Sequence, residues 1–132
     1  MERRAQGRPR GDQHQSRSLN EHPYGFASRF EGVAGTNPEE LLGAAHAGCF
    51  TMALSLMLGE AGLTAERMET TATVVLEKGT GGFSIPSIHL ALKAKIPGAD
   101  DKQFQELAAK AKAGCPVSKL FKADISLDAQ LV

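Results

Sequence analysis

The chain has 132 residues, 42% of them hydrophobic, so it is long enough to bury one core and short for two domains. Fifteen basic residues balance fifteen acidic ones, so the overall charge indicates no nucleic-acid footprint and we expect no nucleic-acid partner. No apolar core follows the first charged residues as it does in a secretory signal peptide, so we expect a cytoplasmic protein whose two cysteines start as reduced thiols.

Residues 1–18 differ in composition from the rest of the chain. They contain five arginines and almost no apolar side chains, so they bury too little surface to offset the entropy lost on ordering. We predict that residues 1–18 are disordered and that the folded domain comprises residues 19–132.

An alternating segment follows at residues 24–31. Tyr24, Phe26 and Phe30 fall on one face of an extended backbone, and Arg29 falls on the other. The alternation predicts a strand that presents an arginine opposite its aromatic side chains.

The stretch NPEELLGAAHAGCFTMALSLMLGEAG, residues 37–62, predicts a long helix. Asn37 is a favourable N-cap, Pro38 suits the first helical position, and Glu39 is an acid at the positive end of the helix. The helix is apolar around nearly its whole circumference, and its length barely suffices to cross a bilayer. His46, the small residues and the absence of flanking basic clusters favour a buried core helix, so we expect no membrane partner.

The second half of the chain carries strand and helix signals in turn. β-branched residues in 68–78, the turn GTGG and the alternation in residues 87–96 predict a hairpin with one apolar face. Helical spacing follows, and a second short helix begins with Pro116, which places Cys115 at a helix N-terminus. Residues 124–131 alternate again and predict a half-buried strand that completes the sheet.

The two cysteines, Cys49 and Cys115, lie 66 residues apart, which excludes a CxxC redox motif and a zinc-finger spacing. Three interpretations are open. Both thiols could be small buried hydrophobic groups. His46 and Cys49, three residues apart on one helix face, could share a metal ion with His89 or Cys115. In the third interpretation an oxidant attacks one thiol and the other resolves the product as a disulfide.

A reactive Cys49 needs a cation from outside its own helix. It lies in the middle of an apolar helix, where burial raises the pKa of a thiol and the helix dipole gives no help. Arg29 is the candidate cation, and Glu39 could hold its guanidinium by a bidentate bond. Glu39 and Cys49 are about 15 Å apart along a straight helix, so one arginine reaches both only if a second copy of the helix comes close. This geometry points to a dimer.

Three stretches together resemble one known family: PYGFASRFEG, TNPEELLGAAHAGCFTMALSLML and AKAGCPVSKLFKADISLDAQL. From about residue 19 to the C-terminus the chain resembles the family of osmotically inducible protein C (OsmC) and organic hydroperoxide resistance (Ohr) proteins, and it is most similar to the OsmC branch. Family members usually begin with an alternating strand pair that contains a Trp-Glu-Gly stretch, and residues 1–18 depart from this pattern.

The resemblance implies an α+β fold, an intertwined homodimer with a central buried helix packed on an antiparallel sheet. It implies a thiol-dependent peroxidase that protects against oxidative stress by reducing organic hydroperoxides to alcohols. Cys49 matches the peroxidatic nucleophile, Cys115 the resolving thiol, and Arg29 with Glu39 the activating pair. The disulfide is recycled by an external dithiol, which in this family can be a lipoylated protein. No metal or organic cofactor is implied.

A rival from another class remains: a non-catalytic structural or binding dimer, in which the same helix is only an interface and the buried thiols are passive.

Overall fold

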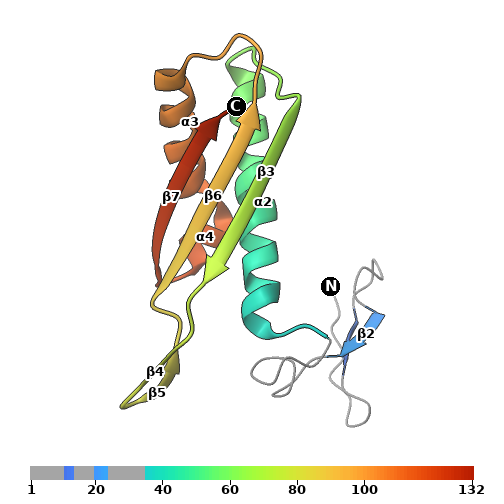
Figure 1. Ribbon diagram of the computed structural model, residues 1–132, viewed down its shortest axis with the longest axis vertical. Helices are drawn as coiled ribbons and strands as arrows, with labels where there is room; N and C mark the ends of the chain where they lie inside the picture. The colour runs from blue at the N-terminus through green and yellow to red at the C-terminus, as the bar shows by residue number, and fades with distance from the viewer. Residues whose placement is uncertain (1–10, 14–19, 24–34) are drawn as a thin grey trace. The chain divides into compact units, whose positions relative to one another are not determined.

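The computed structural model describes residues 11–13, 20–23 and 35–132. The chain divides into two units, residues 1–41 and 42–132. The described elements, labelled in Figure 1 where there is room, are β1 (Gly11–Gln13), β2 (Asn20–Pro23), α2 (Pro38–Glu60), β3 (Arg67–Val74), β4 (Glu77–Gly79), β5 (Gly82–Ser84), β6 (Ser87–Lys95), α3 (Asp101–Gly114), α4 (Pro116–Leu120) and β7 (Asp124–Leu131). The strand predicted at residues 24–31 lies outside the described residues.

The first unit contains a short antiparallel pair, β1 with β2, in which Asp12 lies opposite His22. We predicted no regular structure for residues 1–18, and β1 differs from that prediction at residues 11–13. The reason is that a ladder of this kind joins backbone groups and does not require apolar side chains. The other residues of 1–18 lie outside the described ones, and the domain boundary at residue 19 stays a prediction.

The start of α2 follows the predicted capping. The side chain of Asn37 accepts a hydrogen bond from the backbone N–H of Glu40 at 2.8 Å, and Pro38 is the first helical residue. Thr36 donates to the Glu40 carboxylate at 3.2 Å. Two acids in the first turn, Glu39 and Glu40, complement the positive end of the helix.

The main sheet has the order β3-β6-β7. β3 and β6 form the predicted hairpin, and β4 with β5 extends it as a separate ladder around the GTGG turn. β7 lies parallel to β6, with Ile125 opposite Ile88, so the expected antiparallel sheet is confirmed for β3 and β6 only. The parallel pairing follows from the connection, because α3 and α4 carry the chain back to the end of the sheet where β6 begins (Figure 1).

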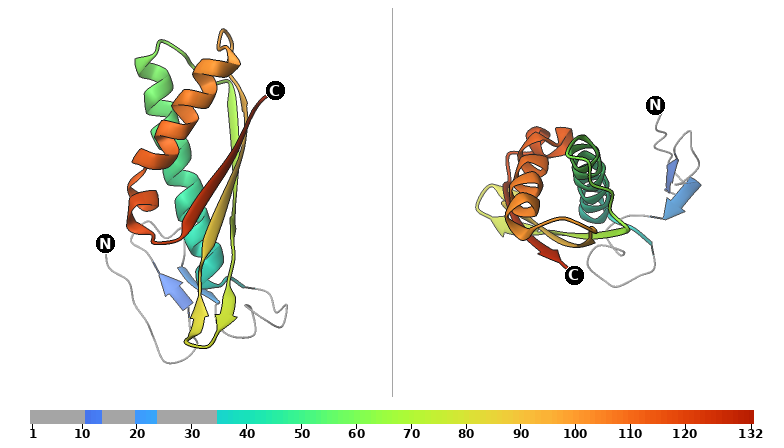
Figure 2. Two further views of the ribbon diagram at one scale, coloured as in Figure 1. Left: turned by 90° about the vertical axis from the view of Figure 1, so that its left-hand side faces the viewer. Right: turned by 90° about the horizontal axis from the view of Figure 1, so that it is seen from above.

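One face of this sheet is apolar and both long helices cover it (Figure 2). The central strand β6 alternates strictly, and the predicted inward set is buried: Ile88, Leu90, Leu92, Ala94 and Ile96. From α3 the core receives Phe104, Ala108 and Ala111, which keep helical spacing. The hydrophobic pattern therefore predicted the face of each of these elements correctly.

The helix α2 presents two different faces. Its buried residues, spaced three or four apart, are Gly43, His46, Phe50, Leu54 and Leu58. On the other side Met52 and Leu56 are 74% and 67% exposed. By length and composition α2 could cross a bilayer, a test that core helices of soluble proteins also pass, and only 28% of its most apolar window is buried.

We predict that Leu54→Ala lowers the free energy of unfolding by about 2–5 kcal/mol, because the fully buried side chain leaves a cavity in the core. Urea unfolding followed by circular dichroism measures the change. Leu120→Ala removes the same atoms from a side chain that is 75% exposed, and it should change the free energy of unfolding by less than about 0.5 kcal/mol. Equal losses in the two variants would contradict this description of the core.

Candidate functional site

The two cysteines come from separate elements that meet under the sheet. Cys49 lies in the middle of α2 and is half-buried. Cys115 ends α3 and begins α4: its backbone N–H donates to Ala111 at 3.0 Å, and Pro116 starts the next helix. Cys115 is fully buried. Because Pro116 has no N–H to continue α3, the chain turns at this point and α4 begins.

The structure brings the two thiols close enough for each to shift the pKa of the other. Their interaction raises the pKa of Cys49 and lowers that of Cys115, the direction expected when the protonated Cys49 thiol faces the Cys115 thiolate. Both cysteines are free thiols, so no disulfide joins them in this state. A contact between residues 66 positions apart in the chain is a property of the fold, and the spacing in the sequence does not reveal it.

Polar groups that can donate to a thiolate lie near Cys115. Burial by itself raises its pKa, but these groups hold the pKa below the ordinary value by stabilising the thiolate. They are the Cys49 thiol, the hydroxyl and backbone N–H of Ser118, and the backbone N–H of Val117. Cys115 is therefore the better thiolate of the pair among the described residues.

Cys49 is in the opposite situation. Burial raises its pKa, its hydrogen bond to Cys115 raises it further, and the backbone N–H of Val117 offsets only part of this effect. None of these groups carries a positive charge. Glu39 lies in the first turn of α2, and Arg29 is outside the described residues, so their predicted ion pair stays a prediction.

His46 occupies the buried face of α2, one turn before Cys49. Its Nε2 lies 2.7 Å from the hydroxyl oxygen of Ser118, and its ring meets that of Phe121 edge-on at 5.4 Å. Burial lowers the pKa of His46, so the ring is neutral. The sequence singled out His46 but not Ser118, since a serine in a short helix has no distinguishing pattern.

The proposed metal ligands do not gather into a site. Within residues 11–13, 20–23 and 35–132, no group of three or more His, Cys, Asp or Glu side chains could hold an ion. His46 is hydrogen-bonded to Ser118. On the exposed face of the sheet, Nδ1 of His89 lies 2.6 Å from the hydroxyl oxygen of Ser126. The described residues therefore give no support to the metal interpretation.

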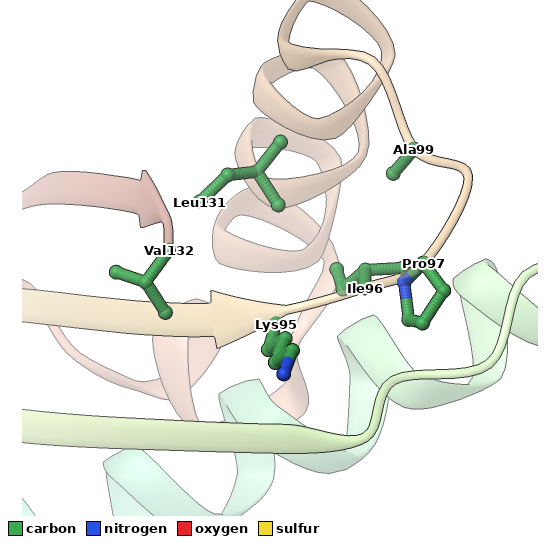
Figure 3. A pocket seen from close by; sticks show the side chains of 6 residues that line it. All are labelled: Lys95, Ile96, Pro97, Ala99, Leu131 and Val132. Carbon is green, nitrogen blue, oxygen red and sulfur yellow. The ribbon is translucent and has the colours of Figure 1, made fainter.

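A pocket of about 310 Å³ lies where β6 ends, and Figure 3 shows its mainly apolar lining. Six residues line it: Lys95, Ile96, Pro97, Ala99, Leu131 and Val132. Neither cysteine is among them, and the Lys95 ammonium forms an exposed ion pair with Glu66 at 3.3 Å. This pocket offers no nucleophile, so the thiol pair remains the candidate site.

A half-buried thiol in contact with a buried one, on a helix packed against a sheet, is the arrangement of a two-cysteine redox protein. The family model described as OsmC-like protein matches residues 30–130. The chain belongs to the family of OsmC-like proteins.

Two curated relatives narrow the class. The chain is 59% identical over 113 residues to peroxiredoxin OsmC of Escherichia coli, which covers 86% of this chain and 79% of that protein. It is 31% identical over 102 residues to organic hydroperoxide resistance protein OhrB of Bacillus subtilis, covering 76% and 73%. Both relatives indicate a cysteine-based peroxidase.

Solved structures agree with the fold. The crystal structure of Bacillus subtilis OhrB superposes with a TM-score of 0.74 at 28% identity, covering 99% of this chain and 95% of that one. An OsmC-like protein from Mycoplasma pneumoniae reaches a TM-score of 0.78 at 15% identity and covers 100% and 99%, which shows the shared fold.

We predict that in a Cys49→Ser variant the remaining thiol, Cys115, titrates below the ordinary cysteine pKa, because the new hydroxyl at position 49 can donate where the Cys49 thiol did and the groups of α4 stay in place. The pH dependence of alkylation by iodoacetamide, followed by mass spectrometry, measures this pKa. Since folding lowers it, the thiolate stabilises the fold above the unfolded-state pKa of about 9.0, and this stabilisation is lost as the pH falls through the folded-state pKa. A pKa above 9.0 would contradict the assignment.

Proposed function

We propose that this protein reduces organic hydroperoxides to alcohols, with Cys49 as the nucleophile and Cys115 as the resolving thiol. The proximity of the two thiols carries the proposal, because a sulfenic acid formed on one sulfur would have the other sulfur beside it. The names of the two curated relatives support the reaction class and the substrate. We place the reaction in the cytoplasm, where thiols stay reduced.

The first step is attack of the Cys49 thiolate on the terminal oxygen of the hydroperoxide. The S–O bond forms as the O–O bond breaks, and the alkoxide takes a proton and leaves as the alcohol. Cys49 has then lost two electrons and is a sulfenic acid.

The second step is attack of the Cys115 thiolate on the Cys49 sulfur. The S–S bond forms, the S–O bond breaks, and hydroxide leaves and is protonated to water. An external dithiol, which the family resemblance suggests is a lipoyl group on another protein, then reduces the disulfide by exchange and is itself oxidised.

The first step needs a cation that the described residues around Cys49 do not supply. Its pKa is raised, and the groups that act on it are a thiol and a backbone amide. We assign this role to Arg29, held by Glu39, because a guanidinium beside the sulfur favours the thiolate. The half-buried position of Cys49 on an apolar helix favours alkyl hydroperoxides over hydrogen peroxide.

The exposed side of α2 is assigned to a second copy of the chain. Met52 and Leu56 are large apolar side chains that are exposed to water in one copy. Burying them against the same face of a partner would remove the unfavourable free energy of this exposure. A two-fold contact would also bring two α2 helices together, which one arginine needs in order to reach Glu39 of one helix and Cys49 of another.

We predict that Cys49→Ser abolishes hydroperoxide consumption, while Cys115→Ser permits one turnover and accumulates a sulfenic acid on Cys49. Each variant is treated with one equivalent of an organic hydroperoxide, trapped with dimedone and analysed by mass spectrometry. The wild-type chain should lose two hydrogens as an internal disulfide forms. If both wild-type thiols stay reduced, the protein is a passive dimer rather than a peroxidase.

We predict that the double variant Met52→Glu and Leu56→Glu is monomeric, because two carboxylates on each copy would face each other across the contact. Light scattering after gel filtration measures the mass. Val132→Glu places one carboxylate at an exposed apolar residue of the C-terminus and should leave the dimer intact. A wild-type chain with the mass of one copy would contradict the assignment of this face.

A further inference from the structure

A buried polar pair lies behind the resolving thiol and has no part in the two-cysteine scheme. His46 is fully buried on α2, and Ser118, on α4, is 8% exposed. Their 2.7 Å hydrogen bond joins two elements that are 72 residues apart in sequence. Burying a neutral histidine and a serine among apolar side chains costs free energy unless their polar atoms are hydrogen-bonded.

The hydrogen-bond pattern identifies which ring nitrogen carries the proton. Nδ1 of His46 has no hydrogen-bond partner in the described part of the chain. An unpaired buried N–H is rarer than an unpaired acceptor, so the proton belongs on Nε2, which donates to the hydroxyl oxygen of Ser118. The hydroxyl proton of Ser118 is then directed away from His46.

Cys115 is the N-cap of α4 and Ser118 is the third residue of that helix, the position that faces the N-cap side chain, so the serine hydroxyl lies on the side of the Cys115 sulfur and lowers the pKa of that thiol. His46 therefore donates toward Ser118, and Ser118 donates toward Cys115. In such a series each hydrogen bond polarises the next one. The edge-on ring of Phe121 lies against the imidazole and leaves it little freedom to rotate.

We propose that His46 and Ser118 are positioning residues for the resolving step, and that His46 orients the Ser118 hydroxyl so that it stabilises the Cys115 thiolate for attack on oxidised Cys49. This inference rests on the proposed peroxidase function. Neither residue contacts the hydroperoxide or gives up its proton. The bonds that form and break are those of the second step: S–S forms, S–O breaks, and hydroxide leaves as water.

Few groups shift the pKa of Cys115. Among the described residues they are Cys49 from α2 and the Val117 and Ser118 groups of α4, and Cys49 is the one titratable group of this set. His46 reaches Cys115 through Ser118. A change in the pH dependence of Cys115 can therefore be traced to one donor at a time.

The first experiment measures the two chemical steps separately. After one equivalent of an organic hydroperoxide, rapid quenching and mass spectrometry follow the sulfenic acid on Cys49 and then the disulfide. In Ser118→Ala we expect formation of the sulfenic acid not to be slowed, and formation of the disulfide to slow at least about tenfold at neutral pH, the value of one hydrogen bond to a charged group. The slowing should shrink as the pH rises, because Cys115 then ionises without the hydroxyl.

A matched pair of variants tests His46. In His46→Gln the amide N–H can reach the position of Nε2, whereas in His46→Asn the shorter side chain reaches only the position of Nδ1. We expect His46→Gln to resolve close to the wild-type rate and His46→Asn to resolve as slowly as Ser118→Ala. Ser126→Ala removes the similar but exposed bond to His89 and should change neither step.

The alkylation titration of Cys115 in the Cys49→Ser background makes the test independent of peroxidase activity. Adding Ser118→Ala or His46→Asn should raise the Cys115 pKa, and adding Ser126→Ala should not. An unchanged pKa with Ser118→Ala, or equal pKa values with Gln and Asn at position 46, would overturn the inference. If the wild-type protein forms neither a sulfenic acid nor a disulfide but these pKa values shift as expected, the proposed function fails and the positioning of Cys115 stands.

Discussion

The contact between the thiols of Cys49 and Cys115 is the interaction on which the other features depend. It requires the middle of α2 to lie against the junction of α3 and α4, and the core holds these elements together: Phe50, the residue after Cys49, belongs to the same buried cluster as Phe104 of α3. Placing a sulfur in that position costs solvation, and the backbone N–H groups at the start of α4 offset part of the cost.

The two thiols need to be ionised at different times. Attack on a hydroperoxide requires an anion at Cys49, whereas the described donors favour an anion at Cys115. These demands do not conflict, because the first step converts the Cys49 thiolate into a sulfenic acid, and the Cys115 thiolate is needed only after that step. A cation at Cys49 is needed only for the first step, and the donors at Cys115 then stabilise the nucleophile of the second. One set of groups therefore stabilises the Cys49 thiolate for the first step, and another set stabilises the Cys115 thiolate for the second.

Much of the fold follows from local pattern. Cap chemistry at Asn37, strict alternation along β6 and the proline after Cys115 predicted element type and facing correctly, because each depends on neighbours in sequence. The parallel pairing of β7, the thiol contact and the bond from His46 to Ser118 depend on residues tens of positions apart, and no local period encodes them. The family resemblance supplied the roles of the cysteines, which spacing left open.

The helix α2 is apolar on nearly every side, and its two faces explain why. An amphipathic stripe marks a helix with one apolar neighbour and water opposite. In α2 the face with Phe50 and Leu54 packs against the core, and the face with Met52 and Leu56 is apolar and stays exposed among the residues that the structure describes. A helix between two layers loses its periodicity because both layers select apolar residues. The proposed second copy would be the layer over the face with Met52 and Leu56, which the described residues of one chain leave exposed.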